Sequence, residues 1–110
     1  MRRVTLMLAA VALMVSLFAV VAYAAEIEGT NKQDFLNEST GDDTINGGDR
    51  GDTIMANLYG LDRDEVDGDQ GHDTLNVADG DDADTAKGGN GWDTCVGDPG
   101  DDLDCEMETQ

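Results

Sequence analysis

An apolar residue recurs two positions after an aspartate throughout residues 29–105, and the residues on either side of it are mostly polar. Thr44-Ile45-Asn46 and Thr74-Leu75-Asn76 show the local form, which is typical of a very short strand with one inward side chain. Glycine- and aspartate-rich stretches, which are typical of loops, separate these segments. The pattern therefore predicts an all-β chain in which short strands and loops alternate.

The pattern has a period of nine residues and repeats eight times. The units are 29–37, 38–46, 47–55, 59–67, 68–76, 79–87, 88–96 and a degenerate 97–105. The aspartates at the sixth position are Asp34, Asp43, Asp52, Asp64, Asp73, Asp84, Asp93 and Asp102. The residues at the eighth position, which we expect to face inward, are Leu36, Ile45, Ile54, Val66, Leu75, Ala86 and Cys95, followed by Asp104 in the last unit. An array with one fixed period indicates a solenoid.

Two inserts interrupt the array. Ala56-Asn57-Leu58 precedes the fourth unit and Val77-Ala78 precedes the sixth. Because both fall between units, we expect them either to bulge out or to break the stack, and we expect Asp64 to belong to the weakest internal site.

The last unit allows two registers. Register 97–105 places Asp104 in the inward position, whereas a shift of one residue places Asp101 sixth and Leu103 inward. The shifted register also turns Cys105 to the inner side, since alternate residues of a strand share a face. In that register the unit is a cap, which covers an open strand edge.

Three units carry a known nonapeptide pattern. Residues 88–96, Gly-Gly-Asn-Gly-Trp-Asp-Thr-Cys-Val, fit G-G-x-G-x-D-x-U-x, where U is apolar, the calcium-binding repeat of RTX proteins. Residues 47–55 depart from it only at Arg50, and residues 68–76 only at Asp69. The array over residues 29–105 thus resembles the hemolysin-type, or RTX, calcium-binding repeat family. This resemblance implies an all-β fold, a right-handed parallel β-roll (β-solenoid) of about four turns, with two units in each turn.

The resemblance also implies calcium held between loops of successive turns. Calcium takes six to eight oxygen ligands, and glycines let a loop curl so that its carbonyl groups point at one ion. The implied ligand positions are Asp34, Asp43, Asp52, Asp64, Asp73, Asp84 and Asp93, with Gly47, Gly48, Gly88, Gly89 and Gly91. Units two apart would stack, so that Asp34 meets Asp52 and Asp43 meets Asp64. Six such pairs allow up to about six ions in an array of this kind.

The large negative charge of the chain indicates that it needs bound cations to fold. The chain has 25 acidic and six basic residues and a formal charge of −19, and removal of the arginines at positions 2 and 3 would leave −21. A chain this acidic and this poor in large apolar residues is by default disordered, and acidic disorder is the main alternative. The charge disfavours nucleic acid and anionic membranes as partners. We therefore expect calcium binding and folding to be coupled. An EF-hand is a poor alternative, because residues 62–68 misplace the loop glycine.

The N-terminal segment has the features of a signal peptide. Two arginines precede the almost wholly apolar residues 4–21, and Ala22-Tyr23-Ala24 resembles a cleavage site. We expect residues 1–24 to be removed, residues 25–28 to form a lead-in, and residues 106–110 to be a frayed tail. An uncleaved membrane anchor is the alternative. The expected location is therefore secreted, without stable membrane association after cleavage.

Cys95 and Cys105 are the only cysteines. In an exported chain we expect them to form a disulfide, with a pair of free thiols or a metal site as alternatives.

No residue pattern indicates a catalytic nucleophile or an acid–base pair in an apolar pocket. We therefore expect a secreted, non-enzymatic calcium-binding protein whose folding depends on extracellular calcium. A second hypothesis is a calcium-dependent surface-interaction protein, adhesin-like or binding glycan or ice. It would use the outward threonines at the seventh position, Thr44, Thr53, Thr74, Thr85 and Thr94. The protein or glycan partner and any role as an enzyme subunit stay open.

Overall fold

The structure, a computed structural model, describes residues 24–110, so the expected signal peptide lies outside the described residues apart from Ala24. These residues form ten strands of three residues each in two parallel sheets. Sheet A consists, in spatial order, of β1 (Glu26–Glu28), β3 (Thr44–Asn46), β5 (Glu65–Asp67), β7 (Thr85–Lys87) and β9 (Asp102–Asp104). Sheet B consists, in spatial order, of β10 (Met107–Thr109), β8 (Thr94–Val96), β6 (Thr74–Asn76), β4 (Thr53–Met55) and β2 (Phe35–Asn37).

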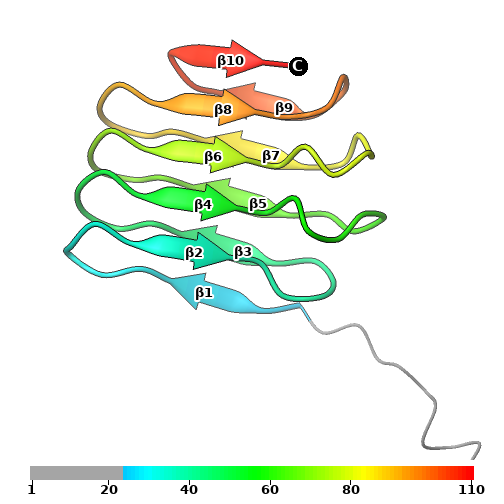
Figure 1. The fold of residues 1–110 in the computed structure, drawn as a ribbon, viewed down its shortest axis with the longest axis horizontal. Helices are drawn as coiled ribbons and strands as arrows, with labels where there is room; N and C mark the ends of the chain where they lie inside the picture. Colours follow the sequence, from blue (N-terminus) through cyan, green and yellow to red (C-terminus); the bar gives the residue numbers. More distant parts are fainter. Residues whose placement is uncertain (1–23) are drawn as a thin grey trace, which may run out of the picture.

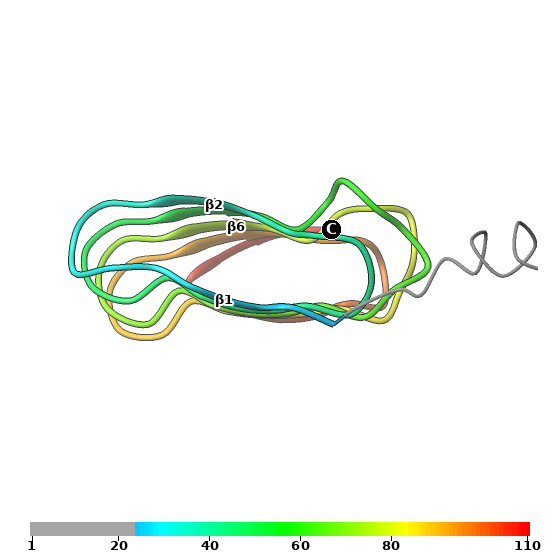
Figure 2. The ribbon, with the colours of Figure 1, turned by 90° about the horizontal axis from the view of Figure 1, so that it is seen from below.

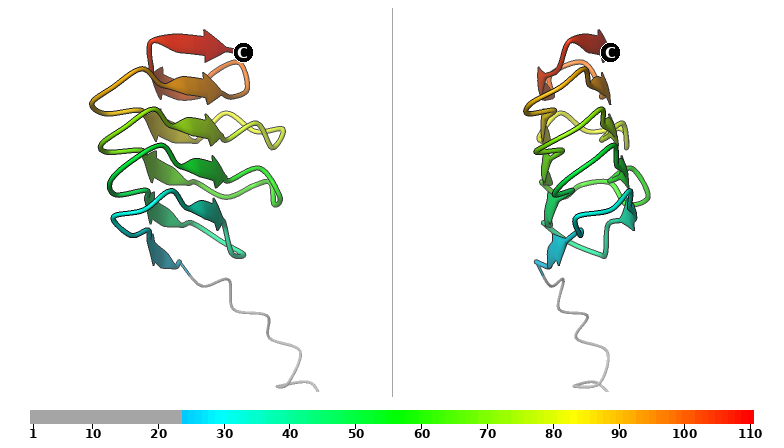
Figure 3. Two further views of the ribbon diagram at one scale, coloured as in Figure 1. Left: turned by 60° about the vertical axis from the view of Figure 1, so that its left-hand side comes forward. Right: turned by 90° about the vertical axis from the view of Figure 1, so that its left-hand side faces the viewer.

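The chain alternates between the two sheets, so each strand pairs with the strands two before and two after it (Figure 1). Seen along the stack, the sheets form the two long sides of a flattened coil (Figure 2). Side views show the turns stacked on one another in chain order (Figure 3). The described chain is thus the all-β parallel solenoid of about four turns that the nine-residue period predicts, and it contains no helix within residues 24–110.

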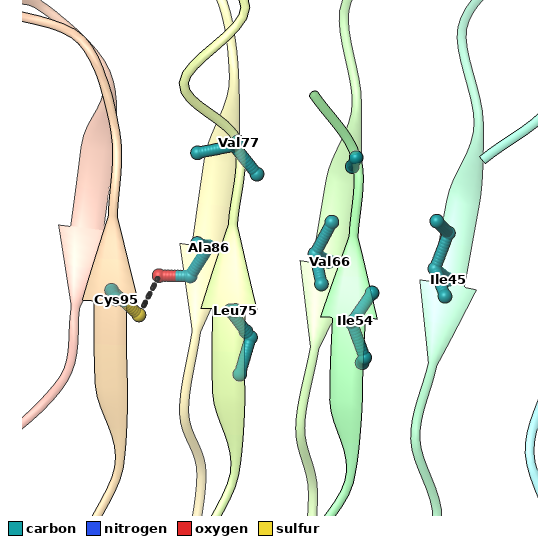
Figure 4. Close-up of a cluster of buried hydrophobic side chains, with 8 residues drawn as sticks. Ile45, Ile54, Val66, Leu75, Val77, Ala86 and Cys95 are labelled. Atoms are coloured by element: carbon teal, nitrogen blue, oxygen red, sulfur yellow. Dashed lines mark hydrogen bonds between the residues drawn. The ribbon is translucent and has the colours of Figure 1, made fainter. Parts of the chain in front are cut away.

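The core is a double ladder of the middle residues of the strands. In sheet A, Ile45 pairs with Val66 and Val66 with Ala86, and in sheet B, Ile54 pairs with Leu75. The eight buried apolar residues have no exposed surface: Ile45, Ile54, Ala56, Val66, Leu75, Val77, Ala86 and Cys95 (Figure 4). Ile27, Leu36, Leu103 and Cys105 are only partly buried around them. The interior is therefore about one side chain thick between the sheets.

The inserts do not break the stack. Ala56 N–H donates to the Asn76 carbonyl at 2.8 Å, and Val77 N–H donates to the Val96 carbonyl at 2.8 Å. Both residues are buried, so the first residue of each insert continues the ladder. The loops that follow are lengthened and project from one edge of the roll (Figure 1). Of the two expected outcomes, bulging is correct.

The roll extends beyond residues 29–105 at both ends. Residues 26–28 of the expected lead-in form β1, which pairs with β3, and residues 107–109 form β10, which pairs with β8. The expectation of a frayed tail is wrong for these three residues. Only two residues, Cys105 and Glu106, connect β9 to β10, so β10 falls outside the nine-residue period. In the last unit the shifted register is correct, since Leu103 pairs with Ala86.

Candidate metal sites

The loops between the sheets form the two edges of the roll. The regular edge consists of the loops from sheet A to sheet B. These are residues 29–34, 47–52, 68–73 and 88–93, each of six residues, and the two-residue connection 105–106 before β10. The irregular edge consists of the loops from sheet B to sheet A, residues 38–43, 56–64, 77–84 and 97–101, of six, nine, eight and five residues. In Figure 1 the regular edge is on the left and the irregular edge is on the right.

Each of these loops except 105–106 ends on an aspartate that precedes a strand, and these aspartates form one column at each edge. The column of the regular edge is Asp34, Asp52, Asp73 and Asp93, and that of the irregular edge is Asp43, Asp64, Asp84 and Asp101. In both columns the backbone N–H of each aspartate except the last donates to Oδ1 of the aspartate one turn later. The distances are 2.7 Å throughout the regular edge, and 2.9, 2.8 and 3.3 Å along the irregular edge. The predicted stacking of Asp34 with Asp52 and of Asp43 with Asp64 is confirmed.

The columns contain buried carboxylate oxygens without partners. Seven of the eight column aspartates are buried, with at most 6% of the surface of each exposed, and Asp34 is half-buried. Within residues 24–110, the Oδ2 atoms without a hydrogen-bond partner include those of Asp52, Asp64, Asp73, Asp84 and Asp93. A buried polar atom almost always has a partner, and an isolated buried charge is costly. Rows of such oxygens are therefore suited to hold metal ions.

Burial raises the pKa of several of these carboxyl groups. Burial and then the contact with the Glu38 carboxyl raise the pKa of Asp64 to about 8. Burial and then the charges of Asp79, Asp81 and Asp101 raise the pKa of Asp84 to about 7. At the regular edge, burial and neighbouring carboxylates raise the pKa of Asp73 to about 6 and that of Asp52 less strongly. Ionised columns are thus destabilised unless a positive charge is present.

Two of the five predicted glycines, Gly47 and Gly88, lie against the regular-edge column, and the other three shape its loops. A Cβ on Gly47 would lie 2.6 Å from Asp52 Oδ2, and one on Gly88 would lie 2.5 Å from Asp93 Oδ2. The first position of these loops must therefore be glycine to leave room beside the unpartnered oxygen. Gly48, Gly89 and Gly91 have φ values of +89°, +86° and +122°, a conformation that favours glycine.

The two departures from the nonapeptide pattern keep the shape of the loop. Arg50 occupies the position equivalent to Gly91 and has a φ of +72°. Asp69 occupies the position equivalent to Gly89 and has a φ of +65°. The backbone of both residues therefore has a left-handed conformation, which is unfavourable for a residue with a Cβ.

The irregular edge carries acidic clusters that the sequence pattern does not reveal. In the described part of the chain, each group of three acidic side chains with oxygen atoms within 4.8 Å of one another lies on this edge. The groups are Glu38–Asp43–Asp64, Asp62–Asp79–Asp81, Asp64–Asp79–Asp84 and Asp81–Asp84–Asp101. Sequence reasoning identified Asp43, Asp64 and Asp84 but missed Glu38, Asp62, Asp79 and Asp81. Glu38 opens a unit where the regular edge has glycine, and this was the one available signal.

Glu106 was also missed. Its Oε2 accepts the backbone N–H of Asp93 at 2.8 Å, so it continues the regular-edge column in place of an aspartate. Its position directly before β10 is equivalent to that of Asp93 before β8.

The end of the roll is covalently closed. Cys95 of β8 and Cys105, next to β9, form a disulfide with Cα atoms 5.8 Å apart. The predicted pairing is confirmed, and a disulfide is typical of proteins in oxidising, extracellular compartments. Among residues 24–110 we find no helix of the length and hydropathy needed to cross a membrane. In comparisons with protein-family models, curated proteins and solved structures, the chain has no match.

Proposed function

We propose that this chain is a secreted, non-enzymatic calcium-binding repeat protein whose folding is coupled to extracellular calcium. The observation that carries the proposal is the double column of buried aspartates, in which Oδ1 binds the backbone of the preceding turn and Oδ2 of five members has no partner. A cation between turns would satisfy these oxygens and offset the repulsion between stacked carboxylates.

The donor set favours calcium among divalent metals. The column ligands are carboxylates, with backbone carbonyl groups of the loops nearby, and these hard oxygen donors suit calcium and magnesium. Softer metals prefer sulfur or imidazole, but both cysteines form the disulfide and the chain has one histidine. Loops of unequal length suit calcium better than magnesium, because magnesium requires nearly ideal octahedral geometry.

Coupling to folding follows from the thin core. Eight buried apolar residues, two of them alanine, provide little hydrophobic stabilisation for ten strands. Without cations the ordered turns would bring like charges together at both edges. Millimolar extracellular calcium would then supply the stability that the core lacks.

The test is a titration of chelator-treated protein with calcium, monitored by far-UV circular dichroism, with magnesium as the control. A cooperative change from coil to strand with calcium, at concentrations where magnesium has no effect, supports the proposal. A coil spectrum that persists at several millimolar calcium rejects it.

A second candidate function uses the outer face of sheet B, which carries no charged side chain at its outward strand positions. These positions hold Phe35, Asn37, Thr53, Met55, Thr74, Asn76, Thr94, Val96, Met107 and Thr109. Thr53, Thr74 and Thr94 are in register on neighbouring strands. The outer face of sheet A carries acids at Glu26, Glu28, Glu65, Asp67, Asp102 and Asp104. In so acidic a chain, an uncharged face favours a neutral partner such as a glycan.

Binding to a glycan array in calcium, or thermal hysteresis in calcium, would support the second candidate. Thr74→Asp should abolish such binding, whereas Thr85→Asp on sheet A should not. If Thr74→Asp and Thr85→Asp had equal effects, the outer face of sheet B would be excluded as the binding surface.

A further inference from the structure

Glu38, Asp43 and Asp64 lie together at the irregular edge, although they come from two successive loops. One oxygen from each lies within 4.8 Å of one from each of the others, and all three residues are buried. Glu38 and Asp43 are the first and last residues of the loop between β2 and β3, and Asp64 is the last residue of the next loop on this edge. Three carboxyl groups thus converge between two turns.

Each of two carboxylates in this group has one oxygen held by the backbone and one without a partner. Glu38 Oε1 accepts the N–H groups of Leu58 and Tyr59, and Asp64 Oδ1 accepts Asp43 N–H at 2.9 Å. Among the residues described, Glu38 Oε2 and Asp64 Oδ2 have no partner, and the exposed fractions of these residues are 6% and 0%. In the folded roll the backbone therefore holds both side chains in place, and their remaining oxygens are shielded from water.

The long loop is what orients Glu38. Leu58 belongs to the three-residue insert, and Tyr59 follows it directly. Without the insert the loop 56–64 would have six residues, as at the regular edge, and would not extend around the Glu38 carboxylate. The departure from the nonapeptide period therefore coincides with an added acidic ligand.

The regular edge offers fewer charges per site. There, glycine occupies the first loop position, and each turn contributes one column aspartate, such as Asp52 or Asp73. Calcium affinity rises with the number of charged ligands and with the rigidity of the site. Three oriented carboxylates should therefore bind calcium more tightly than a site built from paired aspartates and carbonyl groups.

We propose that Glu38, Asp43 and Asp64 form a carboxylate-lined calcium site that differs in kind from the sites of the regular edge and fills before them. The proposal rests on the proposed calcium binding. It reverses the expectation from sequence that Asp64 belongs to the weakest internal site.

The chain contains a separate optical reporter for each edge. Tyr59 lies in the loop that orients Glu38, and Trp92, the only tryptophan, lies in the regular-edge loop 88–93. Terbium, which replaces calcium in oxygen sites, emits when a nearby aromatic residue is excited. The experiment is a terbium titration of the chain without residues 1–24, in which Tyr59 is the only tyrosine. The Trp92→Phe protein then reports Tyr59, and the Tyr59→Phe protein reports Trp92.

The proposal expects the emission sensitised by Tyr59 to reach half of its maximum at a lower terbium concentration than that sensitised by Trp92. In the Trp92→Phe background, Glu38→Gln should raise the Tyr59 midpoint by about tenfold or more. The matched control is Glu28→Gln, the same change at an exposed position of β1, which should shift it less than about twofold. The proposal would be overturned if the Tyr59 and Trp92 midpoints coincided or if the Trp92 signal rose first. It would also be overturned if Glu38→Gln and Glu28→Gln shifted the Tyr59 midpoint equally.

Two measurements separate this proposal from the proposed function. Glutamine keeps an oxygen that can accept the Leu58 and Tyr59 N–H groups, so the calcium-saturated circular dichroism of Glu38→Gln should equal that of the wild type. If that variant does not fold, Asp64→Asn replaces it. Asparagine keeps an Oδ1 that can accept Asp43 N–H but lacks the unpartnered Oδ2, so this variant should also raise the Tyr59 midpoint. If only the three-carboxylate site is wrong, the wild type still folds when calcium is added. If the proposed function is wrong, calcium does not induce folding of the wild type.

Discussion

The backbone N–H of Asp52 donates a hydrogen bond to Oδ1 of Asp73 at 2.7 Å, and Oδ2 of Asp73 has no partner among residues 24–110. One oxygen of this side chain therefore joins two turns of the roll, and the other is available to a ligand. Because the relationship repeats along both edges, we infer that stacking of the turns and cation binding use the same aspartates.

Asp73→Asn should weaken calcium binding without removing the contact between turns. Asparagine keeps an Oδ1 acceptor but replaces the unpartnered Oδ2 with an amide nitrogen, so we expect the calcium midpoint to rise by about tenfold. A calcium titration monitored by circular dichroism measures it. The control is Asp102→Asn, because Asp102 faces outward on β9 although it occupies the sixth position of the unshifted last repeat. Equal shifts for both variants would contradict the role of the column.

Arg50→Gly should stabilise the calcium-bound protein. Arg50 has a φ of +72°, so glycine would relieve strain worth about 1 kcal/mol or more. Urea unfolding in saturating calcium measures the change in the free energy of unfolding. Arg50→Ala is the control, since it removes the same charge but keeps a Cβ, and it should bring no gain. A similar stability for both variants would show that the loop is not strained.

Protons should partly replace calcium in the chelated protein. Burial raises the pKa of Asp64 to about 8 and that of Asp84 to about 7, above the value of about 4 expected in the unfolded chain. The folded state therefore binds more protons than the unfolded state between about pH 4 and pH 8, and its stability falls as the pH rises through that window. We expect the chelated chain to contain more strand at pH 5 than at pH 8, as measured by circular dichroism.

The same linkage predicts that the calcium midpoint rises on acidification from pH 8 to pH 5, because protons compete for the column oxygens. If the strand content of the chelated chain increased with pH, the raised pKa values of the buried carboxyl groups would be contradicted.

Removal of the disulfide should loosen the C-terminal cap. Cys95 and Cys105 close a loop with a sequence separation of 10 residues, so the double variant Cys95→Ala, Cys105→Ser should lose about 2 to 3 kcal/mol of stability. Hydrogen exchange should show the largest loss of protection in β9 and β10, whereas β3 and β4 should change least. Uniform loss of protection along the roll would mean that the bridge does not act as a local cap.

The sequence predicted the repeating part of the fold because each strand requires only one inward apolar residue at a fixed distance from an aspartate. The positions of Ile45 and Leu75 in the period were therefore enough to predict the strands they belong to and the register of those strands. β10 escaped prediction because a two-residue connection shortens the period, and Glu106 was missed with it.

The acidic clusters of the irregular edge were harder to predict. Glu38 acquires its role through the N–H groups of Leu58 and Tyr59, some twenty residues later, and this contact depends on the path of a loop without a repeat. Asp79 and Asp81 similarly approach Asp84 only because loop 77–84 is eight residues long. The nine-residue period predicts residues that recur in every turn, but it cannot predict a contact that occurs in only one turn.

The most direct test of the central claim is the radius of gyration of the purified chain by small-angle X-ray scattering, first in millimolar calcium and then after exhaustive dialysis against EDTA. For the chain without residues 1–24 we expect a compact radius of roughly 13 Å with calcium and an expanded radius of roughly 30 Å without it. A radius that stays at the compact value after dialysis would contradict the claim that cations between the turns hold this roll together.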